Sequence, residues 1–317
     1  MGNRIWKMLI QMILVISLVM CVPAAALATE ETEPEKTMPA YEVDRESAVY
    51  QTCDALAEGM AAKHILVYDN TADTILYSKP QEGGKLYPAS ITKLFSCYVA
   101  LQYLQPDELL TAGSELELVQ EGSSMAYIYK KQQVTAEMAV EGMMLPSGND
   151  AAMILAAAAG RRIAGDESLA PEAAVAEFVD EMNRQAESLG FEQSHFASPD
   201  GYHMGAHYTC VNDMARIAKL ALENKTLRKY MGLFEDSVIY ASGQSNHWEN
   251  TNLFLDPEDG FYHPAAIGMK TGRTRQAGYC LMSAFRVGKR TLVIGMFGYD
   301  DEYARFRDTL KILYACA

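Results

Sequence analysis

The order of the predicted strands and helices along the chain is the feature that most restricts its fold. Short apolar runs at 64–68 and 74–78 surround a polar turn and predict a β-hairpin. Two longer apolar runs, 279–287 and 290–298, are joined by Gly288-Lys289, the two-residue turn of a second hairpin. The predicted strands therefore come from both ends of the folded part.

The middle of the chain is rich in Ala, Met, Glu and Leu and predicts helices. The segment 134–190 has this composition, with breaks expected at Pro146 and Gly160, and 211–223 has it again. A last helix is expected from Glu302 onwards. The simplest architecture is an α+β fold with two lobes. An antiparallel sheet, made from the first and last segments, is flanked by helices and carries an inserted helical lobe. We expect a binding cleft where sheet and lobe meet.

Two segments precede this folded part. Residues 1–28 begin with Arg4 and Lys7, continue without charge and end in small residues, which predicts a signal peptide that is cleaved on export. An uncleaved membrane anchor is the alternative, because the uncharged stretch is long enough to cross a bilayer. Residues 29–46 are acidic with few apolar side chains and predict a disordered stalk. The folded domain is then expected over 47–317.

Charge and cysteine usage narrow the possible functions. The chain has 41 acidic and 27 basic side chains, so we expect no binding to nucleic acid through general electrostatics. Its six cysteines are widely spaced and do not resemble a disulfide scaffold. His203 and His207, with His195 and Cys210, are a candidate zinc set. Prolines and glycines between them prevent the helix that would align the ligands, so a loop role is favoured and we expect no metal.

Ser90 and Lys93 are the first of three candidate catalytic motifs. They are three residues apart at the start of a predicted helix, so their side chains share one face. A serine hydroxyl becomes a nucleophile when a neighbour takes its proton, and a lysine can take it when burial or a nearby cation lowers the lysine pKa. A helix N-terminus also offers free N–H groups to an oxyanion. A serine cap beside a solvent-facing lysine is the alternative.

Ser147-Gly148-Asn149 is the second motif. It follows a proline that should end the preceding helix, which places the triplet on a loop. Ser147 could relay a proton to a leaving amine, and Asn149 could hydrogen-bond the substrate backbone. The same residues are ordinary turn formers, and on the triplet alone a turn is favoured.

Lys270-Thr271-Gly272 is the most specific of the three motifs. On an exposed strand edge it would let an extended peptide add by backbone hydrogen bonds, and Gly272 would allow close approach. Lys270 would add a positive charge that lowers the pKa of Lys93, and Thr271 could bind a terminal carboxylate. A basic turn before a strand is the alternative. Together, the order and placement of the three motifs favour one acyl-transfer site, which needs no metal or cofactor.

Beyond these motifs, the chain carries Tyr87-Pro88-Ala89, Gly122-Ser123-Ser124-Met125 and Ala277-Gly278-Tyr279. With them it resembles the serine D-Ala-D-Ala carboxypeptidases, the low-molecular-mass penicillin-binding proteins, over nearly all of 62–317. The resemblance implies a serine β-lactamase/DD-peptidase-like fold. It also implies that Ser90 is the nucleophile, Lys93 its base and Ser147 a proton relay. The oxyanion hole would be formed by the backbone N–H groups of Ser90 and Arg273. The substrate-binding residues that it implies are Asn149, Lys270, Thr271, Gly272, Arg273 and Arg305.

The resemblance further implies an exported enzyme, secreted or associated with the cell wall. Its substrate would be a peptidoglycan peptide ending in D-Ala-D-Ala, and penicillins and other β-lactams would inhibit it covalently. Many relatives carry an additional β-domain and a membrane-binding C-terminal helix, and we expect 47–317 to be the catalytic domain without the β-domain. Membrane contact would then require an uncleaved N-terminal segment.

Other activities of the same fold remain open. A DD-endopeptidase would use the same motifs. A class A β-lactamase would need a glutamate in a Glu-x-x-Leu-Asn setting to activate water, and no Leu-Asn pair occurs in this chain. A non-catalytic sensor of the cell wall or of β-lactams is disfavoured by the intact motifs.

Overall fold

The structure is a computed structural model, and it describes residues 38, 41–80 and 84–316. All of these belong to one compact unit that spans Thr37–Ala317. The predicted signal peptide and most of the predicted stalk lie outside the described residues, so both stay predictions.

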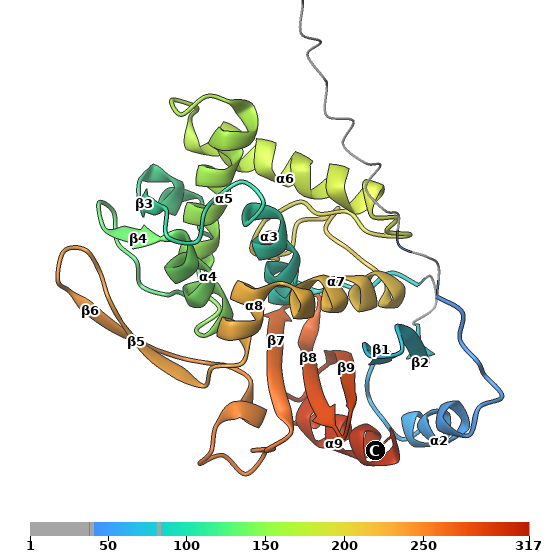
Figure 1. Cartoon of the computed structure of the whole chain (residues 1–317). Helices are drawn as coiled ribbons and strands as arrows, with labels where there is room; N and C mark the ends of the chain where they lie inside the picture. Colours follow the sequence, from blue (N-terminus) through green and yellow to red (C-terminus); the bar gives the residue numbers. More distant parts are fainter. Residues whose placement is uncertain (1–37, 39–40, 81–83, 317) are drawn as a thin grey trace, which may run out of the picture. The chain divides into compact units, whose positions relative to one another are not determined.

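A five-stranded antiparallel sheet forms the centre of this unit (Figure 1), in the order β2-β1-β9-β8-β7. Its strands are β1 (His64–Asp69), β2 (Thr74–Lys79), β7 (Ala266–Thr274), β8 (Gly278–Val287) and β9 (Arg290–Tyr299). The first strand of the chain pairs with the last, which confirms that the sheet joins the first and last segments. Among the described strands β7 pairs only with β8, so one edge of β7 is available to a ligand.

Two helices cover one face of the sheet. They are α2 (Ala48–Ala57) near the beginning of the described chain and α9 (Ala304–Cys316) at its end. An apolar cluster joins both helices to the sheet, including Phe306 from α9 and Phe285 from β8. Because successive strand residues point to opposite faces, β8 and β9 can be buried on both sides only when helices cover the second face as well.

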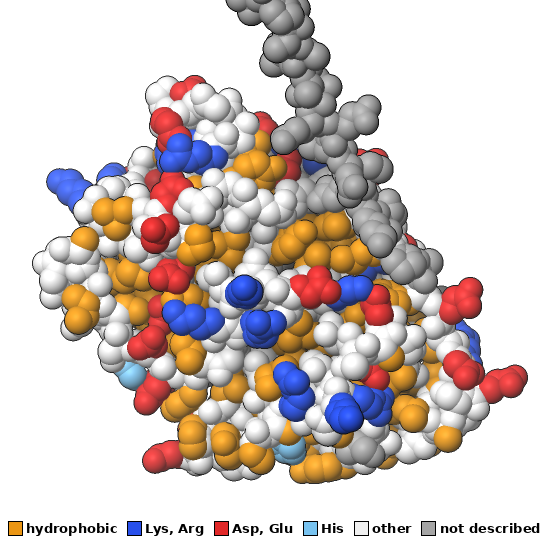
Figure 2. Space-filling view, viewed as in Figure 1, with side chains coloured by type: hydrophobic (Ala, Val, Ile, Leu, Met, Phe, Trp, Pro, Cys, Tyr) orange, Lys and Arg blue, Asp and Glu red, His pale blue; other side chains and the backbone are white. Residues whose placement is uncertain are grey.

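The second face is covered by the helical part of the chain, as predicted. The helices are α3 (Thr92–Ala100), α4 (Ala136–Met144), α5 (Asn149–Ala164), α6 (Pro171–Ser188), α7 (Val211–Glu223) and α8 (Lys225–Met231). In Figure 1, α7 and α8 cross the upper ends of the strands, and α3 to α6 form the lobe above them. Figure 2 shows acidic and basic side chains interspersed with apolar ones on this side of the molecule.

The predicted helix break at Pro146 is confirmed, and the one at Gly160 is wrong. The helix α4 ends at Met144, whereas α5 continues through Gly160 to Ala164. A Cβ at position 160 would lie 1.8 Å from the carbonyl oxygen of Ala174 on α6. Gly160 therefore allows two helices to pack closely and does not end one of them.

Shorter elements complete the fold, and the sequence reasoning did not predict most of them. Two small antiparallel ribbons are β3 (Leu109–Thr111) with β4 (Gln133–Thr135), and β5 (Glu235–Ile239) with β6 (Ser245–Glu249). In the part of the chain that the structure describes, the 3-10 helices η1 (Ala89–Ile91), η2 (Ser114–Leu118) and η3 (Leu253–Leu255) lie between larger elements.

The described end of the predicted stalk contacts the folded domain. The Tyr41 ring packs edge-on against Tyr68, with the ring centres 5.6 Å apart, and its hydroxyl donates to Asp73 over 3.0 Å. Val43 packs against the same core. No helix within the described residues has the length and apolar character needed to cross a membrane.

Candidate active site

Ser90 lies where the chain enters the helix α3. It belongs to the single turn η1, and the preceding Ala89 has a positive φ of 49°. Lys93 is in the first turn of α3 and is fully buried. The predicted sharing of one face is therefore present, and Lys93 Nζ lies 2.9 Å from Ser90 Oγ.

The Lys93 amine is surrounded by three oxygen atoms. Besides Ser90 Oγ, they are Asn149 Oδ1 at 2.8 Å and the backbone oxygen of Asp200 at 2.9 Å. The amide and carbonyl oxygens can only accept hydrogen bonds, whereas the serine hydroxyl can also donate. A neutral amine has two hydrogens and one lone pair. Its hydrogens satisfy the two obligate acceptors, and its lone pair is left to receive the proton of Ser90.

Burial increases the fraction of Lys93 that is neutral. Desolvation lowers the pKa of Lys93 to about 8, although the nearby carboxylate of Asp200 opposes the shift. The sequence predicted that the charge of Lys270 would lower the Lys93 pKa, but the cause of the lowered pKa is burial. Lys270 is itself fully buried, and its own pKa falls well below the usual value because of desolvation and the charge of Lys93. Burial and the charge of Lys93 thus both oppose a positive charge on Lys270.

Ser147-Gly148-Asn149 forms the turn between α4 and α5, as the proline predicted. Ser147 is buried and has a positive φ of 63°, and Gly148 N donates to the Gly142 oxygen over 2.8 Å. Asn149 begins α5 and holds Lys93. The turn is thus a tightly built part of the site.

Asp150 fixes the loop that faces this turn. Its fully buried carboxylate accepts hydrogen bonds from the backbone N–H groups of Ala126, Ile128 and Ala151, at 2.8 to 2.9 Å. Asn149 N donates to the Ser124 oxygen over 2.8 Å. The loop at 121–128, which forms one wall of the cleft, is therefore anchored to the start of α5.

The strand β7 brings Lys270-Thr271-Gly272 against the start of α3. A Cβ at Gly272 would lie 2.9 Å from the Pro88 oxygen and 3.0 Å from Ser90 N. Only glycine allows this approach without displacing backbone. The Thr271 hydroxyl is hydrogen-bonded to that of Thr251. The third motif is therefore in direct contact with the segment that carries Ser90.

Arg305 and Arg273, the two arginines predicted to bind substrate, differ in their exposure to solvent. Arg305 is buried, and its guanidinium donates to the Cys280 oxygen over 2.9 Å and to the Gly272 oxygen over 3.4 Å. It thus stabilises the pairing of β7 with β8, and a contact with substrate stays a prediction. Arg273 is exposed and lies over the Tyr279 ring, 4.8 Å from its centre.

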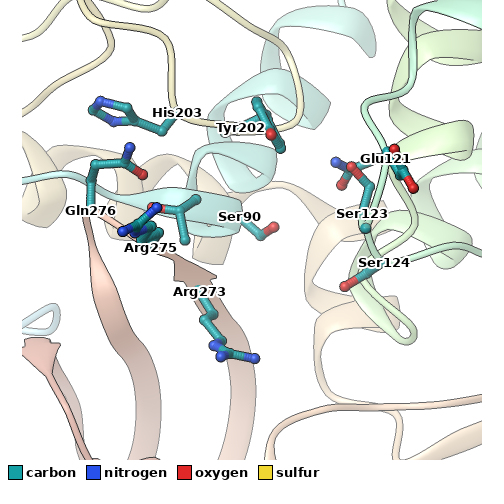
Figure 3. Close-up of a pocket in the computed structure, with 13 residues that line it drawn as sticks. Ser90, Glu121, Ser123, Ser124, Tyr202, His203, Arg273, Arg275 and Gln276 are labelled. Carbon is teal, nitrogen blue, oxygen red and sulfur yellow. The ribbon is translucent and has the colours of Figure 1, made fainter.

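A cavity of about 730 Å³ opens beside Ser90 (Figure 3). One wall is the loop at 121–124, and the other walls are the end of β7 and the loop at 201–203. The lining residues are Ser90, Glu121, Gly122, Ser123, Ser124, Asn149, Gly201, Tyr202, His203, Arg273, Thr274, Arg275 and Gln276. The cleft thus brings together Ser90, which is the candidate nucleophile, the adjacent buried Lys93, which is the candidate base, and the end of β7.

The loop at 196–209 contributes more than the sequence suggested. Its backbone provides the Asp200 oxygen to Lys93, and Gly201, with a φ of 80°, passes so close to Ala89 that a Cβ would lie 1.9 Å from the Ala89 oxygen. His207 is buried and holds this loop, because its Nδ1 accepts from Ala197 N and its Nε2 contacts the Thr92 hydroxyl at 2.8 Å. The contact with Lys93 is made by a backbone oxygen, which every residue type has, so no sequence motif indicates it.

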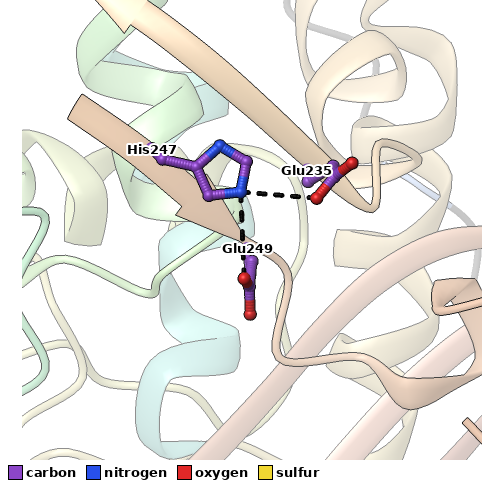
Figure 4. A group of neighbouring side chains, drawn as sticks. All are labelled: Glu235, His247 and Glu249. Atoms are coloured by element: carbon purple, nitrogen blue, oxygen red, sulfur yellow. Dashed lines mark ion pairs between the residues drawn. The ribbon is translucent and has the colours of Figure 1, made fainter. Parts of the chain in front are cut away.

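A group of potential metal ligands lies away from the cavity, on the ribbon β5–β6. Figure 4 shows His247 between Glu235 and Glu249, with its Nε2 at 3.3 and 3.8 Å from their carboxylate oxygens. All three side chains are exposed. Exposed ion pairs of this kind are common at protein surfaces, and we assign no function to this group.

The fold and the Ser-Lys site define the class of the penicillin-binding serine DD-peptidases. A model of the family described as D-alanyl-D-alanine carboxypeptidase, peptidase S11, matches residues 51–299. The chain therefore belongs to this family, which confirms the resemblance predicted from the sequence.

Individual relatives agree with this assignment. The chain is 31% identical to a D-alanyl-D-alanine carboxypeptidase of Streptomyces sp. K15, over 77% of this chain and 83% of that protein. It is 27% identical to the carboxypeptidase DacF of Bacillus subtilis, over 80% of this chain and 61% of that protein. The chain thus spans less than two thirds of the length of several curated relatives, including 53% of the carboxypeptidase DacA of Escherichia coli.

Solved structures confirm the fold. The crystal structure of the Streptomyces K15 DD-transpeptidase superimposes with a TM-score of 0.71 at 29% identity, covering 81% of this chain and 97% of that one. Penicillin-binding protein D2 of Listeria monocytogenes, in its ampicillin-bound form, has a TM-score of 0.64 at 23% identity, covering 81% of this chain and 97% of that one. The predicted two-lobed α+β fold is therefore confirmed.

Proposed function

We propose that this chain is a serine D-alanyl-D-alanine carboxypeptidase that removes the terminal D-Ala from peptidoglycan stem peptides through an acyl-enzyme on Ser90. The observation that carries the proposal is the surroundings of Lys93. Lys93 Nζ lies within 2.9 Å of Ser90 Oγ, Asn149 Oδ1 and the Asp200 backbone oxygen. In its neutral form its two hydrogens can satisfy the last two oxygens, and its lone pair can take the proton of Ser90. Membership of the carboxypeptidase family supports the choice of substrate.

In the acylation step, Lys93 takes the proton of Ser90 while Ser90 Oγ attacks the carbonyl carbon of the penultimate D-Ala. The negative charge that develops on the carbonyl oxygen is stabilised by the backbone N–H groups of Ser90 and Arg273. The close contact of Gly272 with Ser90 N brings these two backbone segments together.

The C–N bond then breaks, and the leaving D-Ala nitrogen needs a proton. Ser147 is the proposed relay that passes a proton to it. The terminal carboxylate of the leaving residue lies on the side of Lys270 and Thr271, with Arg305 behind the strand. Asn149 orients both Lys93 and the substrate backbone.

Hydrolysis of the acyl-enzyme completes the reaction. The glutamate setting that class A β-lactamases use to activate water is not found in this sequence, so a penicilloyl group on Ser90 should be released slowly. Penicillins are therefore proposed to be covalent inhibitors. An export signal at 1–28 and action at the cell wall complete the proposal.

A labelling experiment combined with a D-Ala release assay tests this function. The purified chain should bind a fluorescent penicillin covalently and should release D-Ala from diacetyl-L-Lys-D-Ala-D-Ala. Ser90→Ala should lose both properties. Ser242→Ala, at the exposed turn between β5 and β6, is the matched control and should keep both.

Three results would contradict the proposal. They are the absence of a covalent label on the wild-type protein, the absence of D-Ala release, and rapid turnover of a chromogenic cephalosporin, which would indicate a β-lactamase. Cleavage of a cross-linked dimeric peptide in preference to the linear one would indicate an endopeptidase instead.

A further inference from the structure

Positive charge gathers on one wall of the cavity beside Ser90. Arg273 and Arg275 both line it and both are exposed. Among the described residues neither forms an ion pair with a carboxylate, unlike Arg162 and Arg184, and they differ from the unpaired Arg286 in that both line the cavity. Figure 3 shows Glu121 on the opposite wall, away from both arginines. In a chain with a net charge of −14, two unpaired guanidinium groups in one cleft indicate an anionic ligand.

The position of these arginines along β7 indicates which part of a substrate they face. A peptide that adds to the β7 edge must place its reacting carbonyl at Ser90, next to Gly272. Its leaving residue then lies toward Thr271 and Lys270, which precede Gly272 in the strand. The remaining peptide, on the acyl side of the scissile bond, must continue in the other direction, past Arg273 toward Arg275.

Arginine is well suited to bind a carboxylate at this place. Its planar guanidinium can donate two parallel hydrogen bonds to one carboxylate, and it keeps its charge at every relevant pH. Arg273 is already oriented by the Tyr279 ring. Arg275 follows Thr274, the last residue of β7, and lines the cavity.

We propose that Arg275, together with Arg273, forms a subsite for a second carboxylate, on the residue that precedes the terminal D-Ala-D-Ala. This inference rests on the proposed function, because it uses the direction of a D-Ala-D-Ala peptide in the cleft. The preferred substrates are then stem peptides whose third residue from the C-terminus ends in a free carboxylate. Peptides in which that group is an amide, or is missing, are poorer substrates.

Two isosteric peptides test the subsite. One is acetyl-L-2-aminopimelyl-D-Ala-D-Ala, whose side chain ends in a carboxylate, and the other is its side-chain amide. The ratio of their kcat/KM values should favour the acid about tenfold, the size expected for a charge-assisted hydrogen bond. Arg275→Gln should remove most of this preference and Arg273→Gln part of it. Raising the salt concentration should reduce it in the wild-type protein.

Arg286→Gln is the matched control, because Arg286 is exposed on β8 and does not line the cavity. It should leave the ratio unchanged. A wild-type ratio near one, or a ratio that Arg275→Gln does not lower, would overturn the subsite.

A binding measurement separates failure of the subsite from failure of the proposed function. The dissociation constants of both peptides are measured by calorimetry with Ser90→Ala, alone and combined with Arg275→Gln. If the wild-type protein releases D-Ala from neither peptide, the carboxypeptidase proposal fails. Preferential binding of the acid that depends on Arg275 would still support the subsite, and equal binding of both peptides would refute it.

Discussion

The protonation state of Lys93 should set the pH dependence of Ser90 acylation. The perturbation is a change of pH from 6 to 9, and the observable is the second-order rate constant for acylation by a fluorescent penicillin. This reaction isolates the first chemical step, because release of the penicilloyl group is expected to be slow. Lys93 is fully buried, its pKa is lowered to about 8, and only its neutral form has a lone pair for the Ser90 proton.

The expected magnitude follows from that pKa. The neutral fraction of Lys93 is about 1% at pH 6, about 10% at pH 7 and about half at pH 8. The acylation rate constant should therefore rise about tenfold from pH 6 to 7, about fivefold from pH 7 to 8, and less than twofold above pH 8. The rate constant should rise with pH because Lys93 acts as a base only when it is neutral. If Lys93 acted as a cation, the rate constant would fall over the same range.

A substitution provides the control. Lys93→Arg keeps a positive charge but cannot lose its proton in this range, so it should lower acylation by roughly 100-fold or more at every pH. Circular dichroism should establish that the variant is folded. A wild-type profile that is flat between pH 6 and 9 would refute the assignment of Lys93 as the base, and so would a profile that declines with a midpoint near 8.

Three further predictions concern the framework of the fold. Asp150→Ala should lower the free energy of unfolding by about 3 kcal/mol or more, because three backbone N–H groups lose a buried acceptor; a urea midpoint close to wild type would contradict this. Gly201→Ala should abolish penicillin acylation, whereas Gly243→Ala, which has a similar positive φ but nothing within 4 Å of the new Cβ, should retain it. Cys53 and Cys316, whose sulfur atoms are 3.6 Å apart, should form a disulfide with diamide and raise the melting temperature, and Cys53→Ser should remove that gain.

The sheet and the three motifs were predictable because local patterns encode them. Continuous apolar runs and a Gly-Lys turn mark the strands of the second hairpin, and the pairing of the first and last strands follows from the simplest way to bury them. Ser90 and Lys93 share a helix face through their spacing alone. Such features depend on neighbours in the sequence.

Features that depend on contacts between distant segments were not predictable in this way. Gly160 was interpreted as a helix break because glycine is a poor helix former, but the close approach of α6 determines its role. The contact of Asp200 with Lys93 is made by a backbone oxygen, so the identity of the side chain gives no signal. The proximity of Cys53 and Cys316 joins the first and last described helices and appears only once the chain is folded.

Backbone strain is a feature of the site that local sequence patterns did not indicate. Ala89, Ser147 and Met269 all have positive φ values, which side chains other than glycine rarely adopt. Ala89 precedes Ser90, Ser147 belongs to the second motif, and Met269 precedes Lys270. Such conformations persist only when surrounding contacts over-determine them. Here those contacts are the burial of all three residues and the packing of β7 on the segment that carries Ser90. The same contacts bring Lys93 and Lys270 out of water, so the packing that maintains the strain also lowers the pKa values of the two lysines.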